Sequence, residues 1–285
     1  MCRFLIYRGR EVFLSDLLTE SDQSLIKQSF KARERAEPLN GDGFGVGWYS
    51  HDIDPIPCVF TSTRPAWSNR NLRRLAEKVR STCVFAHVRA ASPDSAVSQA
   101  NCHPFQYQQF LWMQNGWIPE FKKVRRRLRD RLDDQFYNMI QGTTDTEHAF
   151  GLFLHRMKKR LQDYNLETLR ATLVKTIRDL SKLHTATEST EPAFFNFAVT
   201  DGHNIVASRY VTDTEIDAQS LYIAEGRRFI SVDGAYDMTP AEGRVEAAII
   251  ASEPLTADRE DWKAVPANHI VTVSPELHID VSPLD

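Results

Sequence analysis

The chain has 285 residues, of which 42% are hydrophobic and 26% charged, as is typical of a globular protein with a substantial apolar core. Its net charge of -3 argues against a nucleic-acid partner, and no apolar run approaches the roughly 18 residues of a membrane helix. The four cysteines form no C-x-x-C pair and are too few for a disulfide-built scaffold, so we expect a reducing, cytoplasmic location.

The N-terminal part of the chain alternates short strands with turns. The Asn-Gly-Asp-Gly sequence at 40–43 predicts a turn, because Asn-Gly and Asp-Gly tolerate positive φ. A second turn at 52–57 predicts that the strands on either side of it form a hairpin. A helix is expected over 68–78 from its leucine spacing. The predicted strands of this part are 3–7, 44–49, 58–61, 82–88 and 110–113.

The middle of the chain is predicted to be helical over 118–139, 144–158 and 166–183. Thr144 and Glu147 have the spacing of a capping box. Short β-like runs follow at 194–200, 205–210, 221–224, 245–251 and 270–273. Strands, then helices, then strands again indicate two β-sheets with helices stacked on them, and the even composition favours one domain.

Cys2 is the first candidate catalytic residue. If Met1 is removed, Cys2 becomes the N-terminus and carries both a thiol and a free α-amine. An α-amine titrates at about pH 7.7–8.0, so part of it is neutral and can accept the thiol proton without a histidine. The resulting thiolate attacks an amide carbonyl. The alternative is that residue 2 is simply a small buried residue.

The Asn115-Gly116 pair directly follows the predicted strand 110–113. Acyl transfer needs hydrogen-bond donors aimed at the developing oxyanion. The Asn115 amide and the Gly116 backbone N–H suit that role, because glycine lets the backbone approach closely. The alternative is an ordinary Asn-Gly turn.

Arg89 and Asp145 are candidates for binding an amino-acid head group. A guanidinium at the end of a strand can bind an α-carboxylate through two parallel hydrogen bonds. A carboxylate at position 145 can bind a substrate ammonium group. The alternative for Asp145 is a structural role in the first helical turn, where an acid stabilises the helix dipole.

Six segments, in the expected order and spacing, resemble the class II glutamine amidotransferase domain: Met1–Arg3, Asn40–Gly45, Ala86–Arg89, Asn101–Phe105, Asn115–Gly116 and Thr144–Glu147. Within that family the chain is most similar to the branch of fungal glutathione-degradation amidotransferase subunits, and this likeness covers nearly the whole sequence. The segments that carry it are Met1–Ile6, Asn40–Gly45, Pro65–Trp67, Phe85–Ala90, Asn101–Tyr107, Asn196–Gly202 and Ala251–Thr256. The resemblance implies an α+β fold, the four-layer αββα sandwich of the N-terminal-nucleophile hydrolases. We expect one such domain over residues 2–285, with Met1 removed.

The resemblance also implies roles for single residues: Cys2 as nucleophile, Asn115 and Gly116 as the oxyanion hole, and Arg89 and Asp145 as γ-glutamyl ligands. His103 matches a position near the substrate pocket, and a structural histidine beside a proline turn is an equal alternative. No His, Asp or Glu cluster has metal-ligand spacing, so we expect neither a metal nor another cofactor. The basic run at 122–131 is interpreted as a solvated helix face, with a protein-partner surface as the alternative.

These observations predict a hydrolase that cleaves the γ-glutamyl amide bond of glutathione or a related small-molecule γ-glutamyl compound. One alternative is a glutaminase subunit that supplies ammonia to a partner synthase. Another is a non-catalytic subunit, which would follow if Met1 is retained. A Cys-His thiol protease is a weaker possibility. The family likeness further implies a metallopeptidase-like protein partner, and we expect no nucleic acid or membrane partner.

Overall fold

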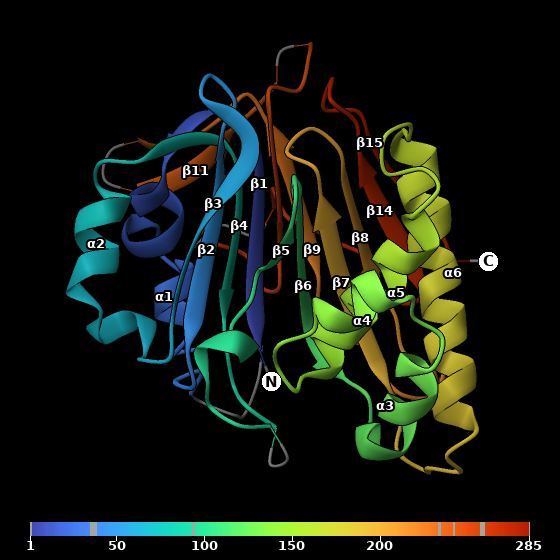
Figure 1. The fold of residues 1–285 in the computed structure, drawn as a ribbon. Helices are drawn as coiled ribbons and strands as arrows, with labels where there is room; N and C mark the ends of the chain where they lie inside the picture. Colours follow the sequence, from blue (N-terminus) through green and yellow to red (C-terminus); the bar gives the residue numbers. More distant parts are fainter. Residues whose placement is uncertain are drawn as a thin grey trace.

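The computed structural model describes residues 2–34, 39–92, 95–232, 235–241, 243–256 and 260–284. Two β-sheets stack face to face, and helices cover the outer face of each sheet (Figure 1). The fold is therefore α+β, a four-layer αββα sandwich, as the resemblance implied. No helix in the described part of the chain is long and apolar enough to span a membrane.

The first sheet contains the N-terminal strand. Its strands in chain order are β1 (Arg3–Phe13), β2 (Phe44–Ser50), β3 (Asp54–Ser62), β4 (Arg80–Val88), β9 (Tyr222–Gly226), β12 (Ala247–Ala251) and β13 (Lys263–Ala264). Across the sheet their order is β13-β9-β12-β1-β4-β2-β3, so β1 lies at the centre between β12 and β4. Both neighbours run antiparallel to β1. The helices α1 (Leu25–Gln28) and α2 (Arg70–Ala76) cover its outer face.

The second sheet follows the same plan. Its strands are β5 (Phe105–Tyr107), β6 (Phe110–Trp117), β7 (Phe194–Thr200), β8 (Ile205–Arg209), β14 (His269–Val273) and β15 (Ile279–Pro283), in the order β15-β14-β8-β7-β6-β5. The helices on its outer face are α3 (Phe121–Arg129), α4 (Asp134–Asn138), α5 (Asp145–Met157) and α6 (Leu166–Thr185). A separate hairpin is formed by β10 (Arg228–Val232) and β11 (Ala235–Thr239).

Alternate residues of the central strands are buried on opposite faces. Phe4 and Ile6 of β1 pack between the sheets with Leu111 and Met113 of β6. The residues next to them in the sequence pack outward, toward the helices. Because both faces of these strands are covered, the strands read as nearly continuous apolar runs instead of alternating ones.

The predicted strands are confirmed, and most extend by a few residues. The single helix predicted over 118–139 is wrong: the chain forms α3 and α4, separated by residues 130–133. Consecutive positive charges in α3 repel at i,i+4 spacing and weaken a longer helix. The break also lets Val124 and Leu128 of α3 and Phe136 of α4 enter the same core. The short strands β5, β13 and β15 and the β10–β11 hairpin were not predicted.

Candidate active site

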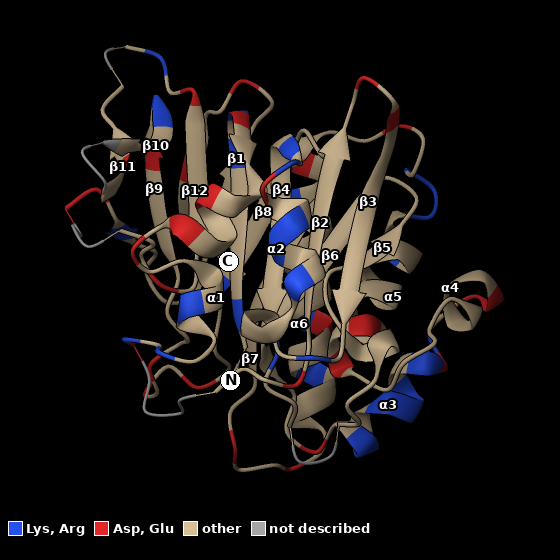
Figure 2. Cartoon of the chain, turned by 90° about the vertical axis from the view of Figure 1, so that its left-hand side faces the viewer, with Lys and Arg blue, Asp and Glu red and all other residues tan. Residues whose placement is uncertain are grey.

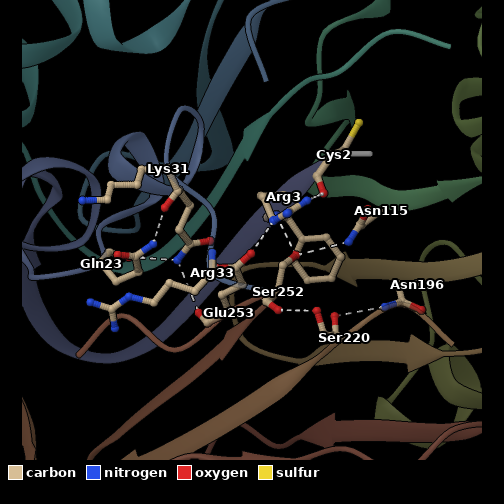
Figure 3. Close-up of polar contacts among 12 residues, drawn as sticks. Cys2, Arg3, Gln23, Lys31, Arg33, Asn115, Asn196, Ser220, Ser252 and Glu253 are labelled. Atoms are coloured by element: carbon tan, nitrogen blue, oxygen red, sulfur yellow. Dashed lines mark hydrogen bonds and ion pairs between the residues drawn. The ribbon is translucent and has the colours of Figure 1, made fainter. Parts of the chain in front are cut away.

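Strand alternation brings Cys2 and Asn115 to one end of the space between the sheets. Side chains two residues apart along a strand lie on the same face. Cys2 is two residues before Phe4 of β1, and Asn115 is two residues after Met113 of β6, so each shares the inward face of its neighbour. Ser252, just after β12, joins the two strands. Its Oγ accepts hydrogen bonds from the backbone N of Phe4 at 3.0 Å and from Nδ2 of Asn115 at 3.4 Å (Figure 3).

The Cys2 thiol is free and half-buried, and its Sγ donates to the carbonyl of Ala90 at 3.5 Å. Burial raises the pKa of this thiol above its ordinary value, while the positive charges of Arg89 and Arg3 act in the opposite direction. A nucleophilic thiol therefore depends here on a nearby base and on its cationic neighbours. Met1, whose removal we predicted, lies outside the described residues.

Asn115 and Gly116 lie within strand β6, where they pair with Asn196 and Phe195 of β7, so the alternative of an Asn-Gly turn is wrong. Asn115 is fully buried, and its Oδ1 has no hydrogen-bond partner within the described chain. Gly116 has a φ of +151°, and a Cβ there would lie 2.1 Å from the carbonyl oxygen of Phe194. This position therefore requires glycine.

Arg89 directly follows β4 and is buried. Its Nη1 donates to the carbonyl of Ala96 at 3.2 Å and to that of Asp42 at 3.4 Å. Its Nη2 donates to Ser95 Oγ at 2.5 Å. Asp42 belongs to the Asn-Gly-Asp-Gly segment, and its carboxylate accepts a hydrogen bond from the backbone N of Ala91. Two loops thus hold the guanidinium close to Cys2.

Asp145 is the first residue of α5. Its Oδ2 accepts from the backbone N of Ile118 at 2.7 Å, and its Oδ1 accepts from that of Thr146 at 2.9 Å. Burial raises the pKa of this carboxyl, and these hydrogen bonds oppose the rise. Asp145 therefore ties the start of α5 to the chain just beyond Gly116. Its place in the first turn of α5 also fits its structural alternative. This geometry leaves its role as a ligand a prediction.

The capping box predicted at the start of α5 is only half formed. Thr144 Oγ1 accepts from the backbone N of Glu147 at 3.2 Å, as expected. The Glu147 carboxylate instead accepts from the backbone N atoms of Gln141 and Gly142 at 2.9 and 2.6 Å. It consequently orders the turn before the helix.

His103 lies in the core and makes no hydrogen bond to Cys2. Its ring centre is 4.1 Å from that of His87 and 4.9 Å from that of Phe105. Burial lowers the pKa of His87 to about 3 and that of His103 well below its ordinary value, so both rings are neutral. His87 Nε2 donates to the carbonyl of Gln114 at 3.0 Å. These contacts favour the structural alternative for His103.

Three residues that the sequence did not single out complete this end of the molecule. Asn101 donates to the carbonyl of Ala96 at 2.8 Å and exchanges hydrogen bonds with Thr143, so it joins the Arg89 loop to the turn before α5. Ser252 and Glu253 contact the first residues of β1. Their only sequence signal was that all three lie in segments carrying the family resemblance.

In the part of the chain that the structure describes, no group of three or more His, Cys, Asp or Glu side chains is arranged to hold a metal ion. The basic run forms α3, whose Val124 and Leu128 are buried while many of its Lys and Arg side chains face solvent (Figure 2). This arrangement agrees with a solvated helix face.

Comparisons with known proteins identify the family. Residues 16–275 match the family model of glutamine amidotransferases class-II. The chain is 43% identical to the probable glutamine amidotransferase DUG3 of Saccharomyces cerevisiae, over 97% of this chain and 82% of that protein. It is 24% identical, over the full length of both proteins, to the gamma-glutamyl-hercynylcysteine sulfoxide hydrolase of Mycolicibacterium smegmatis.

Solved structures share the fold. A glutamine aminotransferase class-II domain protein from silicibacter pomeroyi superposes with a TM-score of 0.67 at 24% identity and covers 99% of both chains. Glutamine phosphoribosylpyrophosphate amidotransferase from B. subtilis superposes with a TM-score of 0.59 at 14% identity, over all of this chain and 49% of that one. The chain therefore belongs to the class II glutamine amidotransferases.

Proposed function

We propose that this protein hydrolyses the γ-glutamyl amide bond of glutathione or a related γ-glutamyl compound, with Cys2 as nucleophile. The observation that carries the proposal is that the Cys2 thiol and the buried Asn115 amide lie at the same end of the inter-sheet layer, joined through Ser252 and Phe4. The proposal requires removal of Met1, because only then is the α-amine of Cys2 free to act as a base.

The reaction follows from the chemistry of these groups. The α-amine takes the thiol proton, and the thiolate attacks the γ-carbonyl carbon. The Asn115 side-chain amide and the Gly116 backbone N–H donate hydrogen bonds to the oxyanion that forms. The C–N bond then breaks, and the leaving amine takes a proton. Water hydrolyses the remaining γ-glutamyl thioester, releasing glutamate and restoring the thiol.

Arg89 and Asp145 supply a matching pair of charges for substrate binding. The α-end of a γ-glutamyl group carries one carboxylate and one ammonium. Arg89, buried at the end of β4, would bind the carboxylate, and Asp145, at the start of α5, would bind the ammonium. Asn101 links the loops that carry them, so their spacing is set by the fold. His103 would shape the pocket without taking part in proton transfer.

The names of two relatives bear on the choice of substrate. The Mycolicibacterium smegmatis relative is named as a hydrolase of a γ-glutamyl compound, which supports hydrolysis of this bond. The yeast relative is named only as a probable glutamine amidotransferase, so release of ammonia from glutamine to a partner synthase is the second candidate. We further propose a metallopeptidase-like protein partner that would process the other product of glutathione cleavage.

Glutamate release from purified protein tests the proposal. Intact-mass measurement first verifies that Met1 is absent from the wild-type protein. This protein should release glutamate from glutathione faster than from glutamine. Cys2→Ala should abolish release, while Cys58→Ala, at an exposed cysteine, should leave it unchanged. Release that persists in Cys2→Ala would eliminate this mechanism, and release from glutamine alone would favour the glutaminase.

A further inference from the structure

We propose that Ser252 and Glu253, two adjacent residues just after β12, are the positioning residues that align the nucleophile with the oxyanion-binding amide. Ser252 acts on Asn115, and Glu253 acts on Cys2 through Arg3 (Figure 3). This inference rests on the proposed function, because it assigns these two residues to the same reaction centre.

Ser252 connects the two sheets. Its backbone N donates to the carbonyl of Phe4 at 3.0 Å, and its Oγ accepts from the backbone N of Phe4, so two hydrogen bonds fix it to β1. The same Oγ accepts from Asn115 Nδ2 at 3.4 Å. An amide nitrogen has two hydrogens. When Ser252 holds one of them, the rotation of the Asn115 side chain is fixed and the second hydrogen has a defined direction.

Ser252 is itself held from the other side. Ser220 Oγ donates to the Ser252 carbonyl at 2.9 Å, and Asn196 Nδ2 donates to the carbonyls of Gln219 and Ser220 at 2.9 and 3.5 Å. Asn196 pairs with Asn115 across β6 and β7. The hydroxyl therefore lies in a closed set of contacts that joins both sheets, which is the support that a preorganised donor needs.

Glu253 holds the residue next to the nucleophile. Its Oε1 lies 2.8 Å from Arg3 Nε, and both side chains are 1% exposed. Arg3 Nη1 in turn donates to the carbonyl of Cys2 at 3.0 Å. Glu253 Oε2 accepts from the backbone N of Arg33 at 2.8 Å, so the same carboxylate also anchors the segment after α1. The Cys2 backbone is thus held by a guanidinium that a buried carboxylate orients.

Through Arg3, the charge of Glu253 should also influence the Cys2 thiol. The charged and titratable groups around this thiol are Arg3 on β1, Arg89 at the end of β4, Cys102, and the α-amine that Met1 removal would free. Glu253 offsets part of the positive charge of Arg3. Its removal should therefore make the surroundings of the thiol more positive and favour the thiolate at lower pH.

Glu253→Gln and Ser252→Ala separate the two effects. Each should lower kcat for glutathione by about tenfold to a hundredfold, because small misplacements of reacting groups are costly, with little change in KM. Ser252→Thr, which keeps the hydroxyl, should recover much of the rate.

Two variants serve as controls and should keep wild-type kcat. Ser208→Ala removes a buried hydroxyl that bridges Phe195 and Phe197, and Glu246→Gln removes the carboxylate paired with Arg10.

Alkylation of Cys2 by iodoacetamide gives a readout that does not depend on turnover. It is followed on the N-terminal peptide by mass spectrometry, in a Cys58→Ala background. Glu253→Gln should move the pH midpoint of alkylation down by about half a unit to one unit, whereas Ser252→Ala should leave it in place. If Glu253→Gln is poorly folded, Glu253→Asp takes its place. It keeps the charge, so the midpoint should stay at the wild-type value, while kcat should still fall because the shorter side chain holds Arg3 less closely. An unchanged kcat in Glu253→Asp would overturn the role of Glu253.

The outcomes separate the two proposals. If the wild-type protein releases no glutamate from any γ-glutamyl compound, the proposed function fails, while the alkylation midpoints still test Glu253. If the wild-type protein is active and folded Glu253→Gln and Ser252→Ala match it in kcat and in midpoint, the positioning roles are overturned. A fall in kcat no larger than any fall seen in the control variants would also overturn the positioning roles.

Discussion

Each end of the β1–β12 strand pair carries an arginine–glutamate ion pair, and the two ion pairs differ in solvent exposure. Arg10 on β1 lies 2.7 Å from Glu246, just before β12, and Arg3 lies 2.8 Å from Glu253, just after it. The Arg10–Glu246 side chains are 43% and 27% exposed, whereas Arg3 and Glu253 are both 1% exposed. The two ion pairs thus have nearly the same N–O distance and differ in burial.

This difference in burial is the reason that we assign a positioning role to only one of the two pairs. Solvent screens an exposed pair and lets its side chains move, so such a pair contributes little to stability. A buried pair lacks that freedom, and removal of one partner leaves a charge in a medium of low polarity. The buried pair also contacts the Cys2 carbonyl and the Arg33 backbone N. In the far pair, Glu246 instead lies 3.6 Å from a second exposed arginine, Arg227.

The largest effect is expected from Glu253→Ala. It should lower the free energy of unfolding by about 3–5 kcal/mol, because it removes the carboxylate that faces the buried Arg3 guanidinium. Urea denaturation followed by circular dichroism measures this change. A loss no larger than that of Glu246→Ala would show that burial does not distinguish the two pairs.

A backbone substitution tests the same contrast between the two ends. Gly116→Ala should cost about 3 kcal/mol, because a Cβ there meets the Phe194 carbonyl at 2.1 Å in an unfavourable φ region. Gly243 has a φ of +106°, but among the described residues beyond its chain neighbours no atom lies within 4 Å of its Cβ position, so Gly243→Ala should cost about 1 kcal/mol. Thermal unfolding compares them. Equal costs would mean that φ strain alone matters.

Acid should destabilise the protein through the buried histidine pair. The folded pKa of His87 is about 3, below the ordinary value of about 6.5, so the unfolded state binds more protons between these values. The stability contributed by neutral His87 is present above pH 6.5 and is lost as pH falls toward 3. The loss amounts to about 2 kcal/mol by pH 5.

His87→Gln keeps a side-chain N–H for the Gln114 carbonyl and should flatten the fall in unfolding free energy between pH 7 and pH 5. The control is at the far end, where His51 and His203 stack with ring centres 4.3 Å apart but are exposed. His51→Gln should change the slope less. An unchanged slope in His87→Gln would contradict the assignment.

The smallest effect is expected from Glu246→Ala. Because its partner Arg10 is exposed, the unfolding midpoint should stay close to the wild-type value and should not depend further on salt. Denaturation at low and high ionic strength checks this. A large loss of stability would place the far pair in the same class as Arg3–Glu253 and remove the contrast.

Much of the fold could be predicted because each central strand reports its surroundings locally. The apolar runs at 82–88 and 194–200 were identified because both of their faces are buried. The β10–β11 hairpin and the two-residue β13 were missed, since short strands depend on their partners more than on their own residues. The helix over 118–139 failed because charge repulsion within α3 and tertiary packing together decided where it ended.

The sequence by itself determined the strand–helix–strand order, the family resemblance and the candidate residues Cys2, Arg89, Asn115, Gly116, His103 and Asp145. These signals are local, since each depends on a few neighbouring residues. Only the tertiary structure decided that Ser252 and Glu253 contact Phe4 and Arg3, about 250 positions earlier in the chain. It also decided which arginine–glutamate pair is buried. Pairing and burial at that range depend on how the sheets assemble, which no local pattern records.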